Sequence, residues 1–242
     1  MVKFDHNCVI VALDFDSESD ALDLLECLNP KWCRVKVGKE LFTRTGPAFV
    51  RRIIESGFDV FLDLKYHDIP NTVAGACSAA AELGCWMVNV HASGGREMML
   101  AAAERLAHYQ SRPLLVAVTV LTSLDYASII EVGYKSAPAK VGLQLASLTQ
   151  QCGLDGVVCS AHEVESIKRQ SGPKFLAVTP GIRTNDSRSD DQRRVASPVG
   201  ALKAGADFLV IGRPITQAAN GGIALKEIYA EIAASHALGV QR

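Results

Sequence analysis

The stretch D-V-F-L-D-L-K, residues 59–65, is a short apolar run that ends in charged side chains. A β-strand points alternate residues to one face, so Asp63 and Lys65 are expected to share the face of Phe61. Asp68 follows after a short turn, from which it can return towards the lysine or reach a neighbouring subunit. Two carboxylates around one amine are costly to assemble unless they bind or transform a molecule. A lone D-x-K, however, is a structural ion pair about as often as it is a functional site.

Seven further apolar runs recur along the chain, usually with a helix-like segment between them. They are C-V-I-V-A-L-D from Cys8, W-C-R-V-K-V-G from Trp32, W-M-V-N-V-H-A from Trp86, L-L-V-A-V-T-V-L from Leu114, G-V-V-C-S-A from Gly156, K-F-L-A-V-T-P from Lys174 and D-F-L-V-I-G-R-P from Asp207. Such near-continuous runs are typical of parallel strands buried on both faces. The clearest helical segments are 21–28, 72–83, 96–108, 144–152, 162–170 and 198–204.

Eight alternations of strand and helix over 242 residues predict a single (β/α)₈ barrel domain, residues 1–242. An open doubly wound sheet is the alternative. The absence of a G-x-G-x-x-G pattern after the first run weighs against that alternative.

The composition narrows the class of protein. Lys plus Arg (25) nearly balance Asp plus Glu (26), which argues against nucleic acid as a main partner. The chain has no signal-peptide pattern and no apolar stretch near the roughly 18 residues of a membrane span, so a cytoplasmic protein without a membrane partner is expected. The seven cysteines are scattered without a C-x-x-C pair, which favours buried thiols in a reducing compartment over a zinc site.

Polar residues collect at the carboxyl ends of the apolar runs. They are Asp14, Lys36, Asp63 with Lys65, His91, Thr119 with Thr122, Ser160, Thr179 and Arg213. In a (β/α)₈ barrel these ends form one rim, where catalytic residues lie. The sequence therefore predicts the active site at the carboxyl ends of the strands.

A four-charge cluster is expected on that rim. Lys36 and Asp63 end neighbouring strands, and with Lys65 and Asp68 their signs alternate, which lets the charges coexist. Between two carboxylates Lys65 stays protonated, so it suits proton donation better than Schiff-base formation. The two aspartates could instead bind a metal, but the adjacent lysines oppose a divalent cation.

Two turns have features of a phosphate site. The seventh run ends T-P-G-I-R (179–183) and the eighth ends I-G-R-P (211–214), and loops after these strands often bind phosphate in barrels. Gly181 and Gly212 let backbone N–H groups approach an anion, and Arg213 can bind it bidentately. The alternative is turn glycines with a surface arginine.

The polar stretch from 183 to 194 lies between these two turns. It is free of apolar anchors and is either a surface loop or a lid that closes over bound phosphate. In a lid, Gln192 would contact both phosphate and base.

The chain combines a protonated lysine beside a carboxylate with a predicted phosphate-binding site, and it has no cofactor motif. This combination suits the formation and protonation of a carbanion. Decarboxylation is such a reaction. A substrate carboxylate near Asp68 would be repelled, and Lys65 would meet the charge that develops on carbon and donate its proton. Binding energy from a distant phosphate would help to close and desolvate the site.

The stretch F-L-D-L-K-Y-H-D-I-P-N-T resembles the signature of the orotidine 5′-phosphate decarboxylase family in its bacterial-type form. The similarity continues, in order, through A-L-D, R-V-K-V-G-K-E, V-N-V-H-A-S-G-G, V-T-V-L-T-S, G-L-D-G-V-V-C-S-A, T-P-G-I-R, D-Q-R-R and V-I-G-R-P. The resemblance implies a (β/α)₈ homodimer that converts orotidine 5′-monophosphate to UMP and CO₂ without metal or organic cofactor.

The resemblance also implies a role for each matching residue. Lys65 is the proton donor, Lys36 and Asp63 complete the charge network, and Asp68 acts from the partner subunit. The remaining substrate-binding residues are Asp14 and Thr72 at the ribose (Thr72 also from the partner), Thr122 and Ser123 near the pyrimidine, Arg183, Gln192, Gly212 and Arg213 at the phosphate and lid, and Ile69 beside Asp68. Tyr66 and His67 receive no role.

Two other functions are open. The first is a metal-dependent sugar-phosphate decarboxylase or aldolase on the same scaffold. The resemblance to such enzymes would require an acidic metal ligand at the end of the second strand, where this chain has Lys36. The second is a catalytically silent phosphate-binding scaffold, and the intact set of Asp63, Lys65 and Asp68 argues against it.

Overall fold

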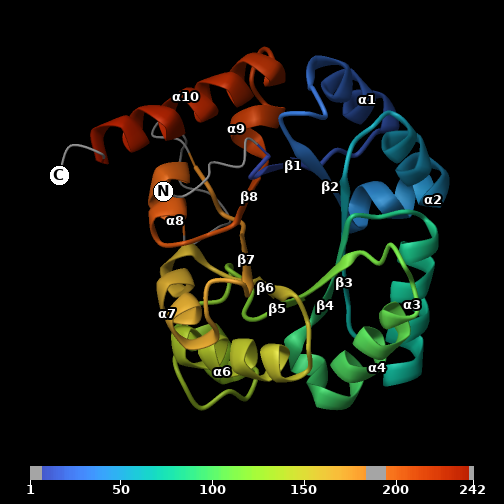
Figure 1. Ribbon diagram of the computed structural model, residues 1–242, viewed down its shortest axis with the longest axis vertical. Helices are drawn as coiled ribbons and strands as arrows, with labels where there is room; N and C mark the ends of the chain where they lie inside the picture. The colour runs from blue at the N-terminus through green and yellow to red at the C-terminus, as the bar shows by residue number, and fades with distance from the viewer. Residues whose placement is uncertain (1–6, 184–194, 240–242) are drawn as a thin grey trace.

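The computed structural model describes residues 7–183 and 195–239 and confirms the predicted single-domain (β/α)₈ barrel. Eight strands pair in sequence order, each parallel to its neighbours, and β8 closes onto β1 (Figure 1). The strands are β1 Val9–Leu13, β2 Arg34–Gly38, β3 Val60–Tyr66, β4 Met87–His91, β5 Leu114–Val118, β6 Gly156–Val158, β7 Leu176–Thr179 and β8 Phe208–Ile211. Seven fall within the apolar runs, β3 extends one residue beyond its run, and the helices surround the strands.

The helices confirm the six predicted segments and add to them. They are α1 Glu18–Cys27, α2 Lys39–Glu55, α3 Pro70–Glu82, α4 Gly95–Ala107, α5 Tyr126–Glu131, α6 Pro138–Gln151, α7 Ala161–Ser171, α8 Pro198–Lys203, α9 Arg213–Thr216 and α10 Gly221–Gly239, with the 3₁₀ turn η1 Ala92–Gly94 before α4. Helix α2 was not predicted because Gly46 and Pro47 interrupt its pattern, and Gly46 has a non-helical backbone (φ 69°, ψ −169°).

The short strands are buried on both faces. In β1, Ile10 and Ala12 join the cluster inside the barrel, whereas Val9, Val11 and Leu13 join the larger cluster between strands and helices. This double burial explains why the runs are apolar throughout instead of alternating. Along the part of the chain that the structure describes, no helix is long and apolar enough to span a bilayer.

The amino-terminal end of the barrel is closed by an arginine stacked on two aromatic rings. The Arg34 guanidinium lies 4.3 Å from the ring centroid of Trp86 and 5.2 Å from that of Phe208, and its Nε lies 3.2 Å from a carboxylate oxygen of Asp59. Cation–π contacts of this kind add to the packing of the rings. The polar cavity described below lies at the opposite end of the strands.

A carboxylate just before β6 stabilises this amino-terminal end. Asp155 accepts hydrogen bonds from both terminal nitrogens of Arg112 (2.7 and 2.8 Å) and from the backbone N–H of Leu115 (2.7 Å). We expect Asp155→Ala to lower the free energy of unfolding by about 1–3 kcal/mol, because it leaves the N–H without this acceptor. Urea unfolding followed by circular dichroism measures the change.

The matched control for this prediction is Glu165→Ala. Glu165 pairs with Arg169 one helical turn away, and both side chains are about three-quarters exposed. That exposed pair should contribute less than about 0.5 kcal/mol. Equal destabilisation by the two substitutions would contradict the role assigned to Asp155.

Candidate active site

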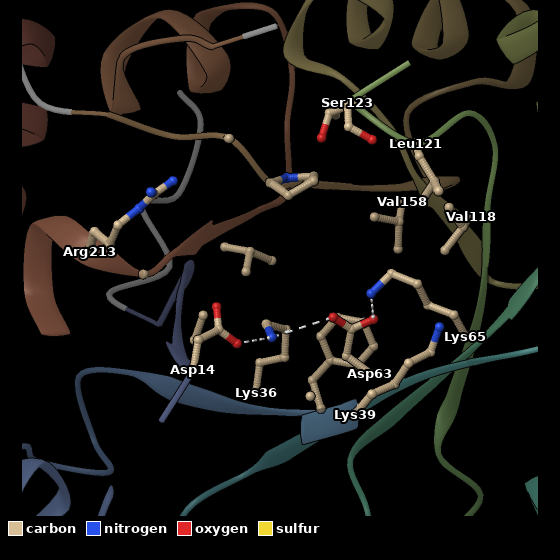
Figure 2. Close-up of a pocket in the computed structure, with 18 of the residues that line it drawn as sticks. Asp14, Lys36, Lys39, Asp63, Lys65, Val118, Leu121, Ser123, Val158 and Arg213 are labelled. Carbon is tan, nitrogen blue, oxygen red and sulfur yellow. Dashed lines mark hydrogen bonds and ion pairs between the residues drawn. The ribbon is translucent and has the colours of Figure 1, made fainter. Parts of the chain in front are cut away.

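A cavity of about 760 Å³ opens at the carboxyl ends of the strands. Its apolar walls include Phe61, Val118, Leu121 and Val158, and charged side chains line its floor and one side (Figure 2). The predicted site residues that line it are Asp14, Lys36, Asp63, Lys65, Thr122, Ser123, Arg183, Gly212 and Arg213. These residues follow six different strands, and the closed barrel brings them together.

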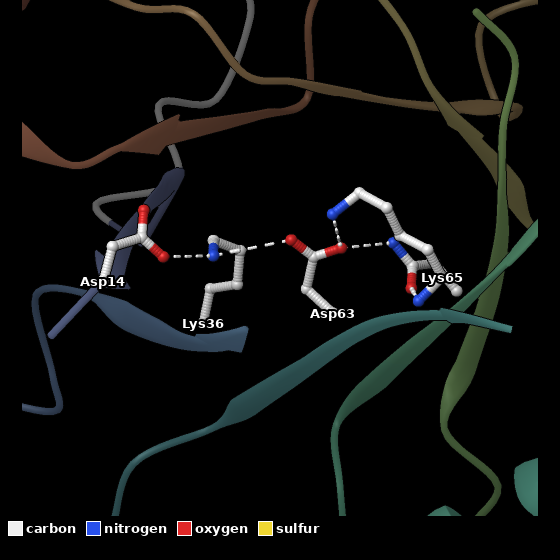
Figure 3. A network of polar contacts seen from close by, with 5 residues as sticks. Asp14, Lys36, Asp63 and Lys65 are labelled. Carbon is white, nitrogen blue, oxygen red and sulfur yellow. Dashed lines mark hydrogen bonds and ion pairs between the residues drawn. The ribbon is translucent and has the colours of Figure 1, made fainter. Parts of the chain in front are cut away.

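Four of these side chains form a continuous row of alternating charge, the charge array of Asp14, Lys36, Asp63 and Lys65 (Figure 3). The Lys36 ammonium lies 2.8 Å from Asp14 Oδ1 and 3.4 Å from Asp63 Oδ2. The Lys65 ammonium donates to Asp63 Oδ1 at 2.7 Å. Asp63 is therefore held between two cations, one at each carboxylate oxygen.

Asn89 of β4 completes the array, although sequence reasoning did not select it. Its Nδ2 donates to Asp63 Oδ1 at 2.7 Å, and its Oδ1 accepts the backbone N–H of Lys65 at 2.8 Å. The side chain is fully buried. The sequence feature that could have identified Asn89 is that it is an amide inside the apolar run that begins at Trp86, because a buried amide requires polar partners.

The backbone at Lys65 departs from a regular strand. Lys65 has φ +52°, and in the described part of the chain it is the one non-glycine residue with a positive φ. The register between β3 and β4 shifts between Leu62 and Tyr66. Simple alternation predicted that Lys65 would meet Asp63, and it does, but through a left-handed backbone that the Asn89 hydrogen bond holds. Left-handed strain of this kind clusters at functional sites.

The electrostatics of the array keep its buried members ionised. Burial by itself raises the pKa of Asp63, but the charges of Lys36 and Lys65 and the hydrogen bonds from Lys65 and Asn89 outweigh it and lower that pKa. Burial likewise acts to lower the pKa of Lys36, and the carboxylates of Asp63 and Asp14 reverse it to a net rise. Each charge of this buried pair is thus stabilised by the other.

The histidine at the end of β4, unlike the residues of the charge array, is uncharged. Burial, followed by the nearby His67, Lys39 and Lys65, lowers the pKa of His91 to about 4. Its ring faces that of His67, with centroids 5.5 Å apart. His91 is therefore neutral at pH 7, and its role in ordering the rim stays a prediction.

The predicted phosphate turn at Arg213 lies on the side of the cavity away from Lys65, and the turn of residues 179–183 also lines the cavity. Gly181 has φ +75°, a backbone that favours glycine, and the chain then pairs Arg183 N–H with the carbonyl of Ala196 at 3.0 Å. Figure 2 shows Arg213 and Lys65 on opposite sides of the cavity, with the rest of the array between them. Gln192, the remaining member of the predicted phosphate set, lies outside the described residues.

Three predicted site residues do not join the cavity of their own chain. Asp68 and Ile69, between β3 and α3, and Thr72, in the first turn of α3, are exposed and do not line the cavity. Asp68 Oδ1 accepts the backbone N–H of Ile69 at 2.6 Å, and the Ile69 side chain is 67% exposed. Of the two directions open to Asp68 from sequence, the structure thus disfavours a return to Lys65 of the same chain.

Comparison with known proteins decides the family. Residues 7–228 match the family described as Orotidine 5′-phosphate decarboxylase / HUMPS family. The chain belongs to this family. Orotidine 5′-phosphate decarboxylase of Pseudoalteromonas atlantica is 56% identical over 226 residues, covering 93% of this chain and 98% of the relative. The enzyme of the same name from Chromobacterium violaceum is 58% identical over 224 residues, covering 93% and 91%.

Two solved structures agree with this chain in fold. The crystal structure of orotidine 5′-phosphate decarboxylase from Lactobacillus acidophilus has a TM-score of 0.82 at 39% identity and covers 93% of this chain and 99% of that one. An uncharacterised conserved protein from Geobacillus kaustophilus has a TM-score of 0.81 at 40% identity, with the same coverage. The predicted family resemblance is therefore confirmed over most of the chain.

The donor set formed by the described residues of the cavity does not suit a metal ion. Among the described residues, no three His, Cys, Asp or Glu side chains lie together as a metal site would require. Each oxygen of Asp63 already faces a lysine ammonium. Two ammonium groups at these distances would repel a divalent cation.

Proposed function

We propose that the chain decarboxylates orotidine 5′-monophosphate to UMP and CO₂, the last step of de novo UMP synthesis. The observation that carries the proposal is Asp63, held between the ammonium groups of Lys36 and Lys65 at the wall of a large cavity. Membership of the family and the named relatives support the substrate. Neither a metal nor an organic cofactor takes part in the proposed reaction.

In the proposed reaction, the substrate carboxylate lies near the carboxylates of Asp63 and Asp68 and is destabilised by them. As the C–C bond breaks, its electron pair stays on the pyrimidine carbon while CO₂ departs. The Lys65 ammonium, 2.7 Å from Asp63, stabilises this charge and donates its proton to the carbon. The neutral amine of Lys65 then takes up one proton from solution, which is the proton consumed in the net reaction, so the enzyme returns to its starting state.

The other residues position the nucleotide. Arg183, Gly212 and Arg213, together with Gln192, are proposed to bind the phosphate on the side of the cavity away from Lys65. Asp14 is proposed to hold the ribose, and Thr122 with Ser123 the pyrimidine. All of these except Gln192 line the cavity. Binding energy gained at the phosphate supports the reaction at the distant carbon.

We also propose a homodimer with shared active sites. Asp68, Ile69 and Thr72 would enter the cavity of a second copy of this chain, Asp68 near Lys65 and Thr72 near the ribose. Their exposure and their position outside their own cavity support this arrangement. A cytoplasmic location, with no nucleic acid or membrane as partner, stays a prediction from the sequence.

Product analysis tests the proposed function. Purified protein incubated with orotidine 5′-monophosphate is expected to release one UMP and one CO₂ for each substrate consumed. Chromatography of the nucleotides and capture of CO₂ from substrate labelled at the carboxylate measure both products. Substrate that persists unchanged, or that is consumed without release of CO₂, would overturn the proposal.

The phosphate role is tested by Arg213→Ala. We expect KM for orotidine 5′-monophosphate to rise about 10- to 100-fold, because a charge-assisted contact to the phosphate is lost. The control is orotidine, which lacks the phosphate, and its slower decarboxylation should not change. Equal losses on the two substrates would show that Arg213 does not act through the phosphate.

A further inference from the structure

Lys39 is a cation of the cavity that neither the charge array nor the phosphate turns include. It is the first residue of α2, directly after β2, and its side chain lines the cavity. Figure 2 shows it pointing into the same end of the cavity as Lys65. Its ammonium makes no ion pair with any residue that the structure describes, whereas Lys36 and Lys65 are each paired with Asp63.

This position changes the charge of the reacting end of the cavity. The charge array holds two lysines and two aspartates, so its formal charge is zero. Within one chain, Lys39 makes that end net positive; with the Asp68 that a second copy is proposed to contribute, Lys39 makes it neutral where it would otherwise be net negative. Over the cavity of one chain, five cationic side chains and two carboxylates leave a formal charge of +3.

The charge of the proposed ligands differs by one between substrate and product. A phosphate monoester carries about two negative charges near neutral pH. Orotidine 5′-monophosphate adds a carboxylate, so it carries about three, and it lies in the cavity with that carboxylate at the Lys65 end. UMP lacks the carboxylate and offers nothing charged to that end.

The charge of Lys39 acts on a side chain that also feels Lys65. It acts on His91 together with Lys65, and both contribute, after burial and His67, to the low pKa of that imidazole. Lys39 is exposed, so water partly screens its charge, and we expect an effect on binding of about tenfold instead of a larger one.

We propose that Lys39 is a specificity-determining residue that favours the carboxylate-bearing substrate over the decarboxylated product. The inference rests on the proposed function. Negative charge stays at this end through the transition state, where it moves from the carboxylate to the ring carbon. Lys39 therefore stabilises ground state and transition state alike, which lowers KM without changing kcat. Once CO₂ has left and the carbon is protonated, the attraction ends and UMP is released more readily.

The test replaces Lys39 with methionine, which keeps the length and removes the charge, and with arginine, which keeps the charge. For Lys39→Met we expect KM for orotidine 5′-monophosphate to rise about tenfold, while Ki for UMP and kcat change by less than about twofold. Lys39→Arg should stay near wild type. Lys226→Met, at an exposed lysine of α10, is the matched control and should change none of the three constants.

Three results would overturn the proposal. Equal rises in KM and in Ki for UMP would place Lys39 at the phosphate or ribose. A fall in kcat at constant KM would place it in the chemical step, and unchanged constants would give it no role. If wild-type protein does not convert orotidine 5′-monophosphate, the proposed function fails by itself. Calorimetric Kd values for orotidine 5′-monophosphate and UMP then test the selectivity of Lys39 separately.

Discussion

Replacing Lys65 with alanine is expected to lower turnover of orotidine 5′-monophosphate by more than about 10³-fold, at or beyond the usual scale for a proton-transfer group. The Lys65 ammonium is the cation at Asp63 Oδ1, and it is the proposed source of the proton for the product. Without Lys65, Lys36 is the one described cation that still forms an ion pair with Asp63. Initial rates from the loss of substrate absorbance measure the effect.

Two controls separate chemistry from folding. Lys226→Ala removes an exposed lysine and should leave turnover unchanged. The melting temperature of Lys65→Ala should stay close to that of the wild type, because the Lys65 side chain is only partly buried and Asp63 keeps its contacts with Lys36 and Asn89. Near-normal turnover of the folded variant would refute the assignment of Lys65 as proton donor.

Mixing two inactive variants is expected to restore activity if the active sites are shared. Lys65→Ala and Asp68→Ala should each be nearly inactive as homodimers. In a mixed dimer, one site would carry both defects, whereas the other would combine an intact Lys65 with an intact Asp68. Random exchange of subunits should therefore recover about a quarter of wild-type activity, because half of the dimers are mixed and half of their sites are intact.

The measurement refolds the two variants together from denaturant and follows activity against their mixing ratio. Activity should peak at equal amounts of the two variants. As a control, two variants within the array, Lys65→Ala with Asp63→Ala, should not rescue each other, since both residues line the cavity of their own chain. A mixture of Lys65→Ala and Asp68→Ala that stays inactive would contradict the proposal that Asp68 acts across a subunit boundary.

The sequence predicted the strands well because burial on both faces leaves little choice of residue. The run from Asp59 and its seven counterparts are apolar because each strand packs against side chains inside and outside the barrel. Helix α2 was harder, since Gly46 and Pro47 interrupt a pattern that continues on both sides of them. The helix is kinked at Gly46, so the local signal of a break is correct there, and helical backbone resumes after it.

The site was predictable where charge alone identified it. Lys36, Asp63 and Lys65 stand out because ionised side chains at the ends of apolar strands are costly to bury without a partner. Asn89 was missed because a neutral amide gives a weaker signal, and its value depends on the contact with Asp63 across neighbouring strands. The left-handed backbone of Lys65 has no signature in residue type at all.

The central claim is that the charge array performs decarboxylation without a metal ion. The most direct test is the initial rate of decay of orotidine 5′-monophosphate with protein treated with EDTA, compared with the same protein after addition of Mg²⁺ or Zn²⁺. We expect the same rate in all three cases, because Lys36 and Lys65 supply the positive charge at both oxygens of Asp63. Loss of the rate in EDTA, with recovery on addition of metal, would contradict the claim.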